Sequence, residues 1–233
     1  MSERAARDAA RTPGPGELDP RDAGGRETLI VKDVKERWEV VGSREHFRGR
    51  VIGVRVDEVT MPNGAGTEVT EREVVSHPGA VGVLALDDAD RVLLIRQYRH
   101  PVGHLLWEAP AGLRDVAGEP LLETAQRELL EEAGFRAKTW HVLVDTFTSP
   151  GMTDERKRIF LARDLTETAP PDGFQPVHEE ADMPLAWVPL DEAVAKVLAG
   201  DIHNPTAAVG ILAAYAARAR GYHDLRAPDA AEG

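Results

Sequence analysis

The chain has 233 residues, of which 42% are hydrophobic and 29% are charged, and its formal net charge at pH 7 is −12. This length and apolar content fit one large domain with an appendage. The negative charge argues against nucleic acid or an anionic membrane as a partner, because no local basic patch offsets it. The chain contains no cysteine, which excludes disulfides and thiol catalysis.

Cysteine content alone leaves a secreted protein open. However, the first 26 residues contain no apolar stretch of the kind found in signal peptides, and no segment reaches the roughly 18 apolar residues of a membrane helix. We therefore expect a cytoplasmic protein. Residues 1–26 are rich in Ala, Arg, Asp, Gly and Pro, and we expect them to form a flexible tail.

Residues 27–77 are predicted to form a small N-terminal antiparallel β-sheet domain. Alternating apolar side chains predict strands at residues 28–31, 38–41, 51–56 and 69–76, with turn residues at 61–66. Short strands with few large side chains make a poor core by themselves. This domain is therefore expected to pack on another surface.

Residues 78–222 are predicted to form a larger α/β domain. The pattern predicts strands at 80–86, 91–98, 140–147, 158–162 and 185–190, and helices at 191–199 and 205–220. The first two strands flank Asp87–Asp90, which is typical of a hairpin. Near-continuous apolar runs indicate strands covered on both faces, hence a sheet between helices. The Ala-rich segment 207–217 is too short to cross a membrane and is assigned to the core, and residues 223–233 are expected to be a frayed C-terminal tail.

A further helix is predicted between Pro120, which suits a first helical position, and Gly134, which suits a C-terminal stop. Its buried stripe is formed by Leu122, Ala125, Leu129 and Ala133. Beside that stripe, Glu128, Glu131 and Glu132 share a narrow arc, so they crowd negative charge that a cation would stabilise. By itself the arc is better explained as a solvated face, because like charges one turn apart cost only about 0.2–0.5 kcal/mol per pair.

The complete pattern changes that interpretation. Gly112 is followed by six residues and Glu119, and then by seven residues and the segment Arg127–Phe135, which reads RELLEEAGF. This pattern resembles the Nudix box, which usually has five residues between its first Gly and first Glu. The resemblance implies a Nudix-type α/β/α sandwich with a mixed sheet, preceded by the small N-terminal sheet.

The resemblance also implies roles for the box residues. Glu128 and Glu132 would bind Mg²⁺ or Mn²⁺ together with the backbone carbonyl of Ala111, since these ions prefer hard oxygen ligands. Glu131 would support the site or bind a further metal ion. The residues implied to be structural are Gly112, Glu119, Arg127 and Gly134, with Glu119 and Arg127 pairing to fix the loop against the helix. The implied reaction is hydrolysis of a nucleoside diphosphate linked to a group X.

Three further features resemble the ADP-ribose pyrophosphatase branch: Arg96–Arg99 (RQYR), Trp107–Gly112 (WEAPAG) and Pro150, sixteen residues after Gly134. This resemblance implies substrate-binding roles for Arg96, Arg99, Glu108 and Pro150. Arg99 could bind a phosphate and Glu108 a ribose hydroxyl. The alternatives are a surface charge for Arg99 and a loop cap for Glu108.

The water-activating base is expected in one of two places. Relatives use a glutamate from a late loop, here within 166–182, and Glu179 and Glu180 are the candidates. Glu131 is the alternative, although a nearby cation would lower its pKa and make it a poor proton acceptor. Relatives with a Glu-x-Glu pair would place the second glutamate at Ala181, so this chain would hold fewer metals or use a water there. His178 is expected to be an exposed loop residue.

The expected function is metal-dependent hydrolysis of ADP-ribose to AMP and ribose 5-phosphate. The alternatives are hydrolysis of a nucleotide sugar or nucleoside triphosphate, and a catalytically silent sensor of ADP-ribose, which would not need all three box glutamates. The resemblance further implies a homodimer, formed through the N-terminal domain. Trp38 is expected either in that contact or in the core.

Overall fold

The computed structural model describes residues 31–169 and 183–232. The described residues from Val40 onward form one compact unit, so the boundary expected after residue 77 lies inside it. Residues 31–39 contain no helix or strand, and the strand expected at 38–41 begins only at Val40. Of the strand expected at 28–31, all but Val31 lie outside the described residues. Trp38 is 44% exposed and donates from Nε1 to Glu36 at 2.8 Å, so it is not a core residue of this chain.

The N-terminal sheet has three antiparallel strands in the order β1-β2-β3. They are β1 (Val40–Arg48), β2 (Gly53–Asn63) and β3 (Gly66–Ser76). Gly64 and Ala65 form the tight turn between β2 and β3, where Gly64 adopts a left-handed φ of 59° that glycine tolerates best. Strands β1 and β3 expose most of their side chains, whereas most residues of the central strand β2 are half-buried, as expected for a sheet with little core of its own.

The larger part of the unit contains two further sheets. Its strands are β4 (Ala80–Ala85), β5 (Arg91–Arg99), β6 (His104–Glu108), β7 (Ala111–Leu113), β8 (Phe135–Phe147), β9 (Arg156–Glu167) and β10 (Leu185–Pro189). The orders are β10-β5-β6 and β7-β4-β9-β8, and β4 runs parallel to β9, so the second sheet is mixed. The sequence analysis did not predict β6 or β7 as strands.

The hairpin expected from β4 and β5 is wrong. The two strands belong to different sheets and share only the isolated bridge between Leu86 and Val92. The turn itself is tight, because the Asp87 carboxylate accepts the N–H groups of Ala89 and Arg91 at 3.0 and 2.8 Å. Both edges of β4 are occupied by β7 and β9, so no edge is left for β5.

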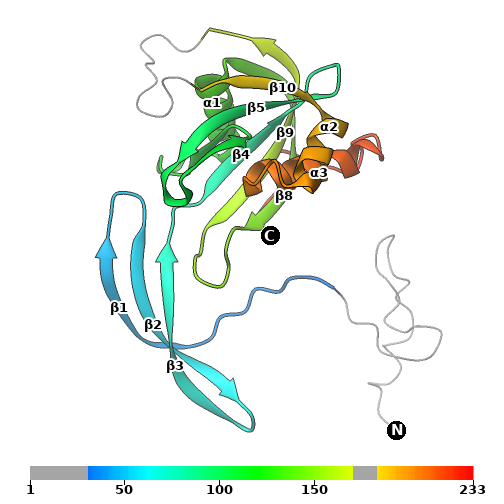
Figure 1. The fold of residues 1–233 in the computed structure, drawn as a ribbon. Helices are drawn as coiled ribbons and strands as arrows, with labels where there is room; N and C mark the ends of the chain where they lie inside the picture. Colours follow the sequence, from blue (N-terminus) through cyan, green and yellow to red (C-terminus); the bar gives the residue numbers. More distant parts are fainter. Residues whose placement is uncertain (1–30, 170–182, 233) are drawn as a thin grey trace, which may run out of the picture. The chain divides into compact units, whose positions relative to one another are not determined.

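Helices cover both faces of the sheets, as the continuous apolar runs predicted. They are α1 (Leu121–Ala133), α2 (Leu190–Ala199) and α3 (Pro205–Arg218), with α2 and α3 together on one side (Figure 1). Strand β4 contributes to both layers: Val81 and Val83 pack with Ala125 and Leu129 of α1, while Leu84 packs with the α2 and α3 side chains. This is an α/β/α sandwich. No helix in the described ranges is both long enough and apolar enough to span a bilayer.

The C-terminal segment, expected to fray, is held against the sandwich. Arg158 of β9 is 3% exposed and donates to the backbone oxygens of Ala230 and Ala231 at 2.6 and 3.1 Å. Arg226 reaches the Asp145 carboxylate of β8 at 2.8 Å. A buried guanidinium needs acceptors, and these carbonyls supply them. The composition of the segment gave no sign of these contacts.

Asp145 should make stability depend on acid pH. Burial alone would raise the pKa of Asp145, but hydrogen bonds from Arg158 and Arg226 outweigh it and hold that pKa below its ordinary value. A carboxyl with a lowered folded-state pKa stabilises fully above the unfolded value of about 3.9 and loses its contribution as pH falls through the folded value. Asp145→Asn should therefore lower Tm most near neutral pH and progressively less below about pH 4. Thermal unfolding measured from pH 3 to 7 tests this, with exposed Asp88→Asn as the control; a pH-independent difference would contradict it.

Candidate active site

Helix α1 carries the candidate catalytic carboxylates. It begins at Leu121, so Pro120 lies one residue before the helix and not at its first position. It ends at Ala133, and the φ of 72° at the next residue, Gly134, lets the Gly134 N–H reach the carbonyls of Leu129 and Leu130. The buried stripe fixes the rotation of the helix and leaves Glu128, Glu131 and Glu132 half-buried along its edge.

Arg127 connects these carboxylates to the loop that precedes the helix. Its Nη1 donates to Glu128 at 2.7 Å and to Glu131 at 3.2 Å, while Nε and Nη2 donate to the two oxygens of Glu119, both at 3.2 Å. Thr124 donates to Glu119 at 2.8 Å. The hydrogen bonds from Arg127 and Thr124 lower the pKa of Glu119, and the bond to Glu119 raises the pKa of Arg127. The pairing of Glu119 with Arg127 thus joins loop to helix, as the sequence predicted.

Strand β7 lies directly against α1, where a loop was expected. The backbone N–H of Ala111 donates to Glu132 Oε2 at 2.8 Å. A Cβ atom at Gly112 would stand only 2.0 Å from Glu128 Oε1 and 2.4 Å from its Cγ. Because no side chain fits there, the glycine is required for Glu128 to rest on the strand.

The donor chemistry of this edge fits a hard divalent cation. The carboxylates of Glu128 and Glu132 meet a backbone strand at a place where only glycine fits, and carboxylate oxygens are what Mg²⁺ and Mn²⁺ prefer. Within residues 31–169 and 183–232, no three Asp, Glu or His side chains already converge in a metal-binding arrangement. A Mg²⁺ ion commonly takes one or two carboxylates and completes its shell with water and substrate oxygens, which this edge could support.

A cavity of about 400 Å³ opens beside β7. Its lining residues are His77, Ala80, Arg99, Pro101, Val102, Leu106, Glu108, Ala111, Gly112, Leu113, Glu155, Lys157, Asn204 and Pro205. Ala111 and Gly112 therefore belong both to the cavity and to the carboxylate edge. The cavity combines an apolar wall with a few charged groups, which is typical of a small-molecule site.

Arg99 and Glu108 form a two-pronged ion pair in this cavity. Arg99 Nε and Nη2 donate to the two oxygens of Glu108 at 2.9 and 2.6 Å, and Glu108 is 1% exposed. A buried carboxylate with both oxygens engaged orients its guanidinium partner. The alternative of a loop cap for Glu108 does not describe this pair, whereas the Arg99 side chain is 42% exposed, as the alternative of a surface charge would have it.

The sequence analysis missed the acidic and basic residues that complete the cavity. Lys157 lies 3.7 Å from Glu155 and donates to Thr206 at 3.0 Å. Burial lowers the pKa of Lys157, against the opposing charge of Glu155. Glu155 also accepts from Thr148 at 2.7 Å and lies 3.9 Å from His77 Nδ1. The sequence offered one indication of this site: Lys157 stands just before residues 159–162 of β9, which are all apolar.

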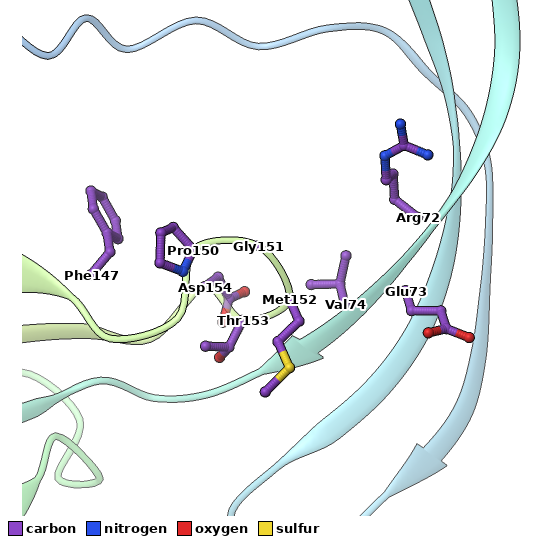
Figure 2. Close-up of a pocket in the computed structure, with 9 residues that line it drawn as sticks. All are labelled: Arg72, Glu73, Val74, Phe147, Pro150, Gly151, Met152, Thr153 and Asp154. Atoms are coloured by element: carbon purple, nitrogen blue, oxygen red, sulfur yellow. The ribbon is translucent and has the colours of Figure 1, made fainter.

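Two predicted substrate residues lie outside this cavity. Arg96 is exposed, and its guanidinium stands 5.8 Å from the centre of the Trp107 ring, a cation–π contact. Pro150 lines a second cavity of about 400 Å³, between the loop after β8 and strand β3 (Figure 2). Glu179 and Glu180, with His178 and Ala181, lie outside the described residues.

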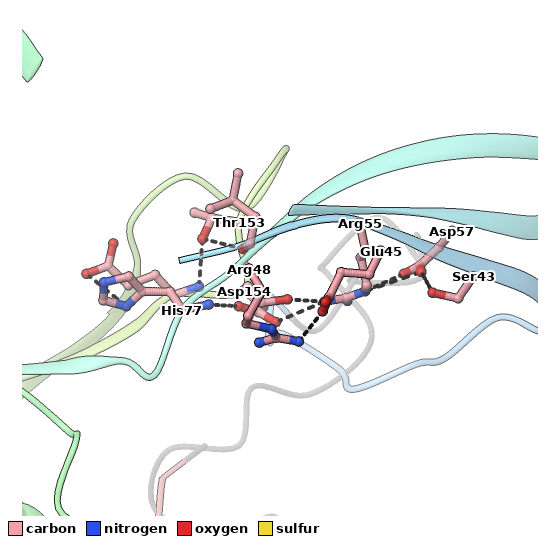
Figure 3. A network of polar contacts seen from close by, with 11 residues as sticks. Ser43, Glu45, Arg48, Arg55, Asp57, His77, Thr153 and Asp154 are labelled. Carbon is pink, nitrogen blue, oxygen red and sulfur yellow. Dashed lines mark hydrogen bonds and ion pairs between the residues drawn. The ribbon is translucent and has the colours of Figure 1, made fainter. Parts of the chain in front are cut away.

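The loop that carries Pro150 is bonded to the N-terminal sheet (Figure 3). The backbone N–H of Val75 donates to Met152 O at 2.8 Å, and that of His77 donates to Asp154 Oδ1 at 2.9 Å. Asp154 also faces Arg55 of β2 at 3.8 Å. The sheet is thereby tied to the loop that ends at Glu155, one wall of the first cavity.

Known proteins resemble this chain in sequence and in fold. The family model described as NUDIX domain matches residues 76–208. The chain is 47% identical over 179 residues to an ADP-ribose pyrophosphatase of Mycobacterium tuberculosis (strain ATCC 25618 / H37Rv), covering 77% of this chain and 84% of the relative. It is 33% identical over 181 residues to an ADP-ribose pyrophosphatase of Bacillus subtilis (strain 168), covering 78% of this chain and 93% of the relative.

A solved structure described as an ADP compounds hydrolase superposes with a TM-score of 0.65 at 24% identity, covering 82% of this chain and 99% of that one. At this identity the likeness concerns the fold alone. The matched box, the sandwich and the two relatives together show that the chain belongs to the Nudix family.

Proposed function

We propose that this protein is a cytoplasmic, divalent-metal-dependent ADP-ribose pyrophosphatase that converts ADP-ribose and water to AMP and ribose 5-phosphate. The observation that carries the proposal is the shared strand β7. Its residues Ala111 and Gly112 contact the carboxylates of Glu132 and Glu128 and also line the cavity that holds Arg99. The two relatives named above support the choice of ADP-ribose over other nucleoside diphosphate derivatives.

Mg²⁺, with Mn²⁺ as the alternative, is the proposed cofactor. Glu128, Glu132 and the Ala111 carbonyl would hold it, and Glu131 would support the site or bind a further ion. When bound, such a cation neutralises phosphate charge and makes phosphorus more open to attack by water. Arg127 already balances part of the charge of Glu128 and Glu131, which keeps the carboxylates close together before a metal binds.

Arg99 is the proposed phosphate-binding residue of the chain. Glu108 fixes its guanidinium from a buried position, so little conformational freedom is lost when an anion binds. Arg96 and Pro150 remain proposed substrate contacts, although both lie outside the cavity that holds Arg99. The cavity at Pro150 is formed with β3, which fits a contribution of the N-terminal sheet to substrate binding.

The water-activating base is proposed to be Glu179 or Glu180, with Glu131 as the alternative. One loop variant, Glu179→Gln or Glu180→Gln, should lower kcat by about 10²–10⁴-fold with little change in KM, and the other should be nearly silent. Steady-state kinetics at saturating Mg²⁺ measures this. If both loop variants keep full kcat while Glu131→Gln loses it, the base belongs to α1.

We also propose a homodimer formed through the N-terminal sheet. Several large apolar side chains of β1 and β3 are exposed, among them Val40, Val41, Phe47 and Val69. Exposed apolar surface of this kind is typical of contact faces. Sedimentation that shows an active monomer at micromolar concentration would contradict the shared-site form of this proposal.

The function is tested with a substrate panel read by mass spectrometry. ADP-ribose, a nucleotide sugar and a deoxynucleoside triphosphate are compared at saturating Mg²⁺, and the highest kcat/KM is expected for ADP-ribose, with AMP as product. A kcat/KM about ten times higher for another compound would assign the protein to another branch of the Nudix family. Binding of ADP-ribose without turnover would indicate a sensor. Fractionation of the producing cells tests the compartment.

A further inference from the structure

Four charged side chains of the cavity beside β7 form two ion pairs. Arg99 is paired with Glu108 at 2.6 Å, and Lys157 with Glu155 at 3.7 Å. At Lys157 a phosphate group would also meet the Glu155 carboxylate, whereas Arg99 is more exposed and remains the proposed phosphate contact. Sugar hydroxyls both donate and accept hydrogen bonds, so the paired ammonium of Lys157 and carboxylate of Glu155 suit them better.

Lys157 is the residue best placed to bind a sugar hydroxyl. Its side chain is 15% exposed, whereas that of Arg99 is 42% exposed, so Lys157 lies deeper in the wall. Thr206 and Glu155 hold its ammonium, which has three N–H donors. Thr148 holds the other oxygen of Glu155 at 2.7 Å. Both members of the pair are therefore positioned in advance.

The cavity suits a sugar without a base. Among the described residues that line it, none is Phe, Tyr or Trp, so it offers no aromatic platform for adenine. It also continues directly from the carboxylate edge through Ala111 and Gly112. A group bonded to a pyrophosphate at that edge would reach the cavity.

We propose that Lys157 and Glu155 bind adjacent hydroxyls of the sugar on the X side of the substrate, which makes Lys157 a specificity-determining residue. The inference rests on the proposed function, because it assigns one end of that substrate to this cavity. It adds a residue pair that the box and its flanking motifs do not contain.

The test compares Lys157→Met with the wild type on two substrates at saturating Mg²⁺. One is ADP-ribose, and the other is the ethyl ester of ADP, whose X group has no hydroxyl. Losing a charged hydrogen bond should lower kcat/KM for ADP-ribose by about 10- to 100-fold and change that for the ethyl ester by less than about threefold. An equal loss on both substrates, or no loss on either, overturns the proposal.

Two controls separate recognition from folding. Thr206→Val keeps the γ-methyl group that packs near Gly82 and removes only the hydroxyl that holds Lys157, so it should reduce the preference for ADP-ribose less than Lys157→Met does. Lys157→Gln keeps a donor without the charge and should show a smaller loss than Lys157→Met. If thermal melting shows that Lys157→Met is not folded, Lys157→Gln is compared with the wild type instead.

Analogues of ADP-ribose identify which of its two riboses Lys157 binds. Removing the 2-hydroxyl of the terminal ribose should abolish most of the difference between wild type and Lys157→Met. The same change on the adenosine ribose should leave that difference in place, and the reverse result overturns the assignment to the X side.

Equilibrium binding distinguishes failure of this inference from failure of the proposed function. If the wild type hydrolyses neither compound, the proposed function fails. Calorimetry without divalent metal then still decides the role of Lys157, since ADP-ribose should bind the variant about 10- to 100-fold more weakly and the ethyl ester equally well. Equal weakening or no weakening overturns the inference.

Discussion

Replacing Glu128 or Glu132 with glutamine is expected to lower kcat for ADP-ribose by about 10²–10³-fold while the fold survives. Either change removes one negative charge from the proposed metal-binding edge and keeps the shape of the side chain. An amide oxygen at position 132 can still accept the N–H of Ala111, now 2.8 Å from the carboxylate. The loss should therefore come from cation binding and not from packing.

The control for this pair is Glu123→Gln, on an exposed position of the same helix. It removes the same charge from α1 away from β7 and should keep near-normal kcat. Activity is measured against Mg²⁺ concentration, and melting temperature is measured for all three variants. Near-normal kcat for Glu128→Gln or Glu132→Gln at saturating Mg²⁺ would show that the residue is not a metal ligand.

Local patterns predicted the box helix well because its signals lie within a few turns of chain. The apolar spacing of Ala125, Leu129 and Ala133 reports a helix face directly, and Gly134 has the left-handed conformation that ends it. The contact between Glu119 and Arg127 spans only eight residues. Pairing inside so short a segment leaves few alternatives, so the motif determined it.

Strand pairing was harder to predict because it depends on distant segments. The turn at Asp87 was expected to close a hairpin, and the turn exists, but β4 pairs with β7 and β9 instead. No local signal at residues 80–98 shows that β9, some 70 residues later, will occupy that edge. Short edge strand β7 was missed for the same reason, because its three residues become a strand only by pairing with β4.

The cavity residues were missed because several elements assemble them. His77 precedes β4, Lys157 is the second residue of β9, and Asn204 caps α3 through Ala207 N–H at 2.9 Å. Each has an ordinary local explanation: a linker histidine, a strand-end charge and a helix cap. Only the three-dimensional arrangement shows that they share a cavity with Arg99 and Glu108.

Gly112→Ala should lower kcat nearly as much as Glu128→Gln, although it removes no charged group. A β-carbon at this position would lie 2.0–2.4 Å from three atoms of the Glu128 side chain, far inside any real contact distance. The carboxylate is the flexible partner and would swing away, so the strand should stay in place. The fold should therefore lose little stability while the proposed metal-binding edge loses one ligand. Gly66→Ala, at a position where the nearest atom would be 3.9 Å away, is the matched control.

A double-mutant cycle decides whether Gly112 acts through Glu128. If its only role is to let that carboxylate rest on β7, Gly112→Ala combined with Glu128→Gln should be no slower than Glu128→Gln alone, within about threefold, because the second change removes a ligand already displaced. If the two losses multiply, the glycine has a separate role, such as shaping the cavity that Gly112 also lines. Kinetics of the two single variants and the double variant at several Mg²⁺ concentrations distinguish these outcomes, since a displaced ligand weakens the apparent affinity for the cation and a reshaped cavity raises KM for ADP-ribose.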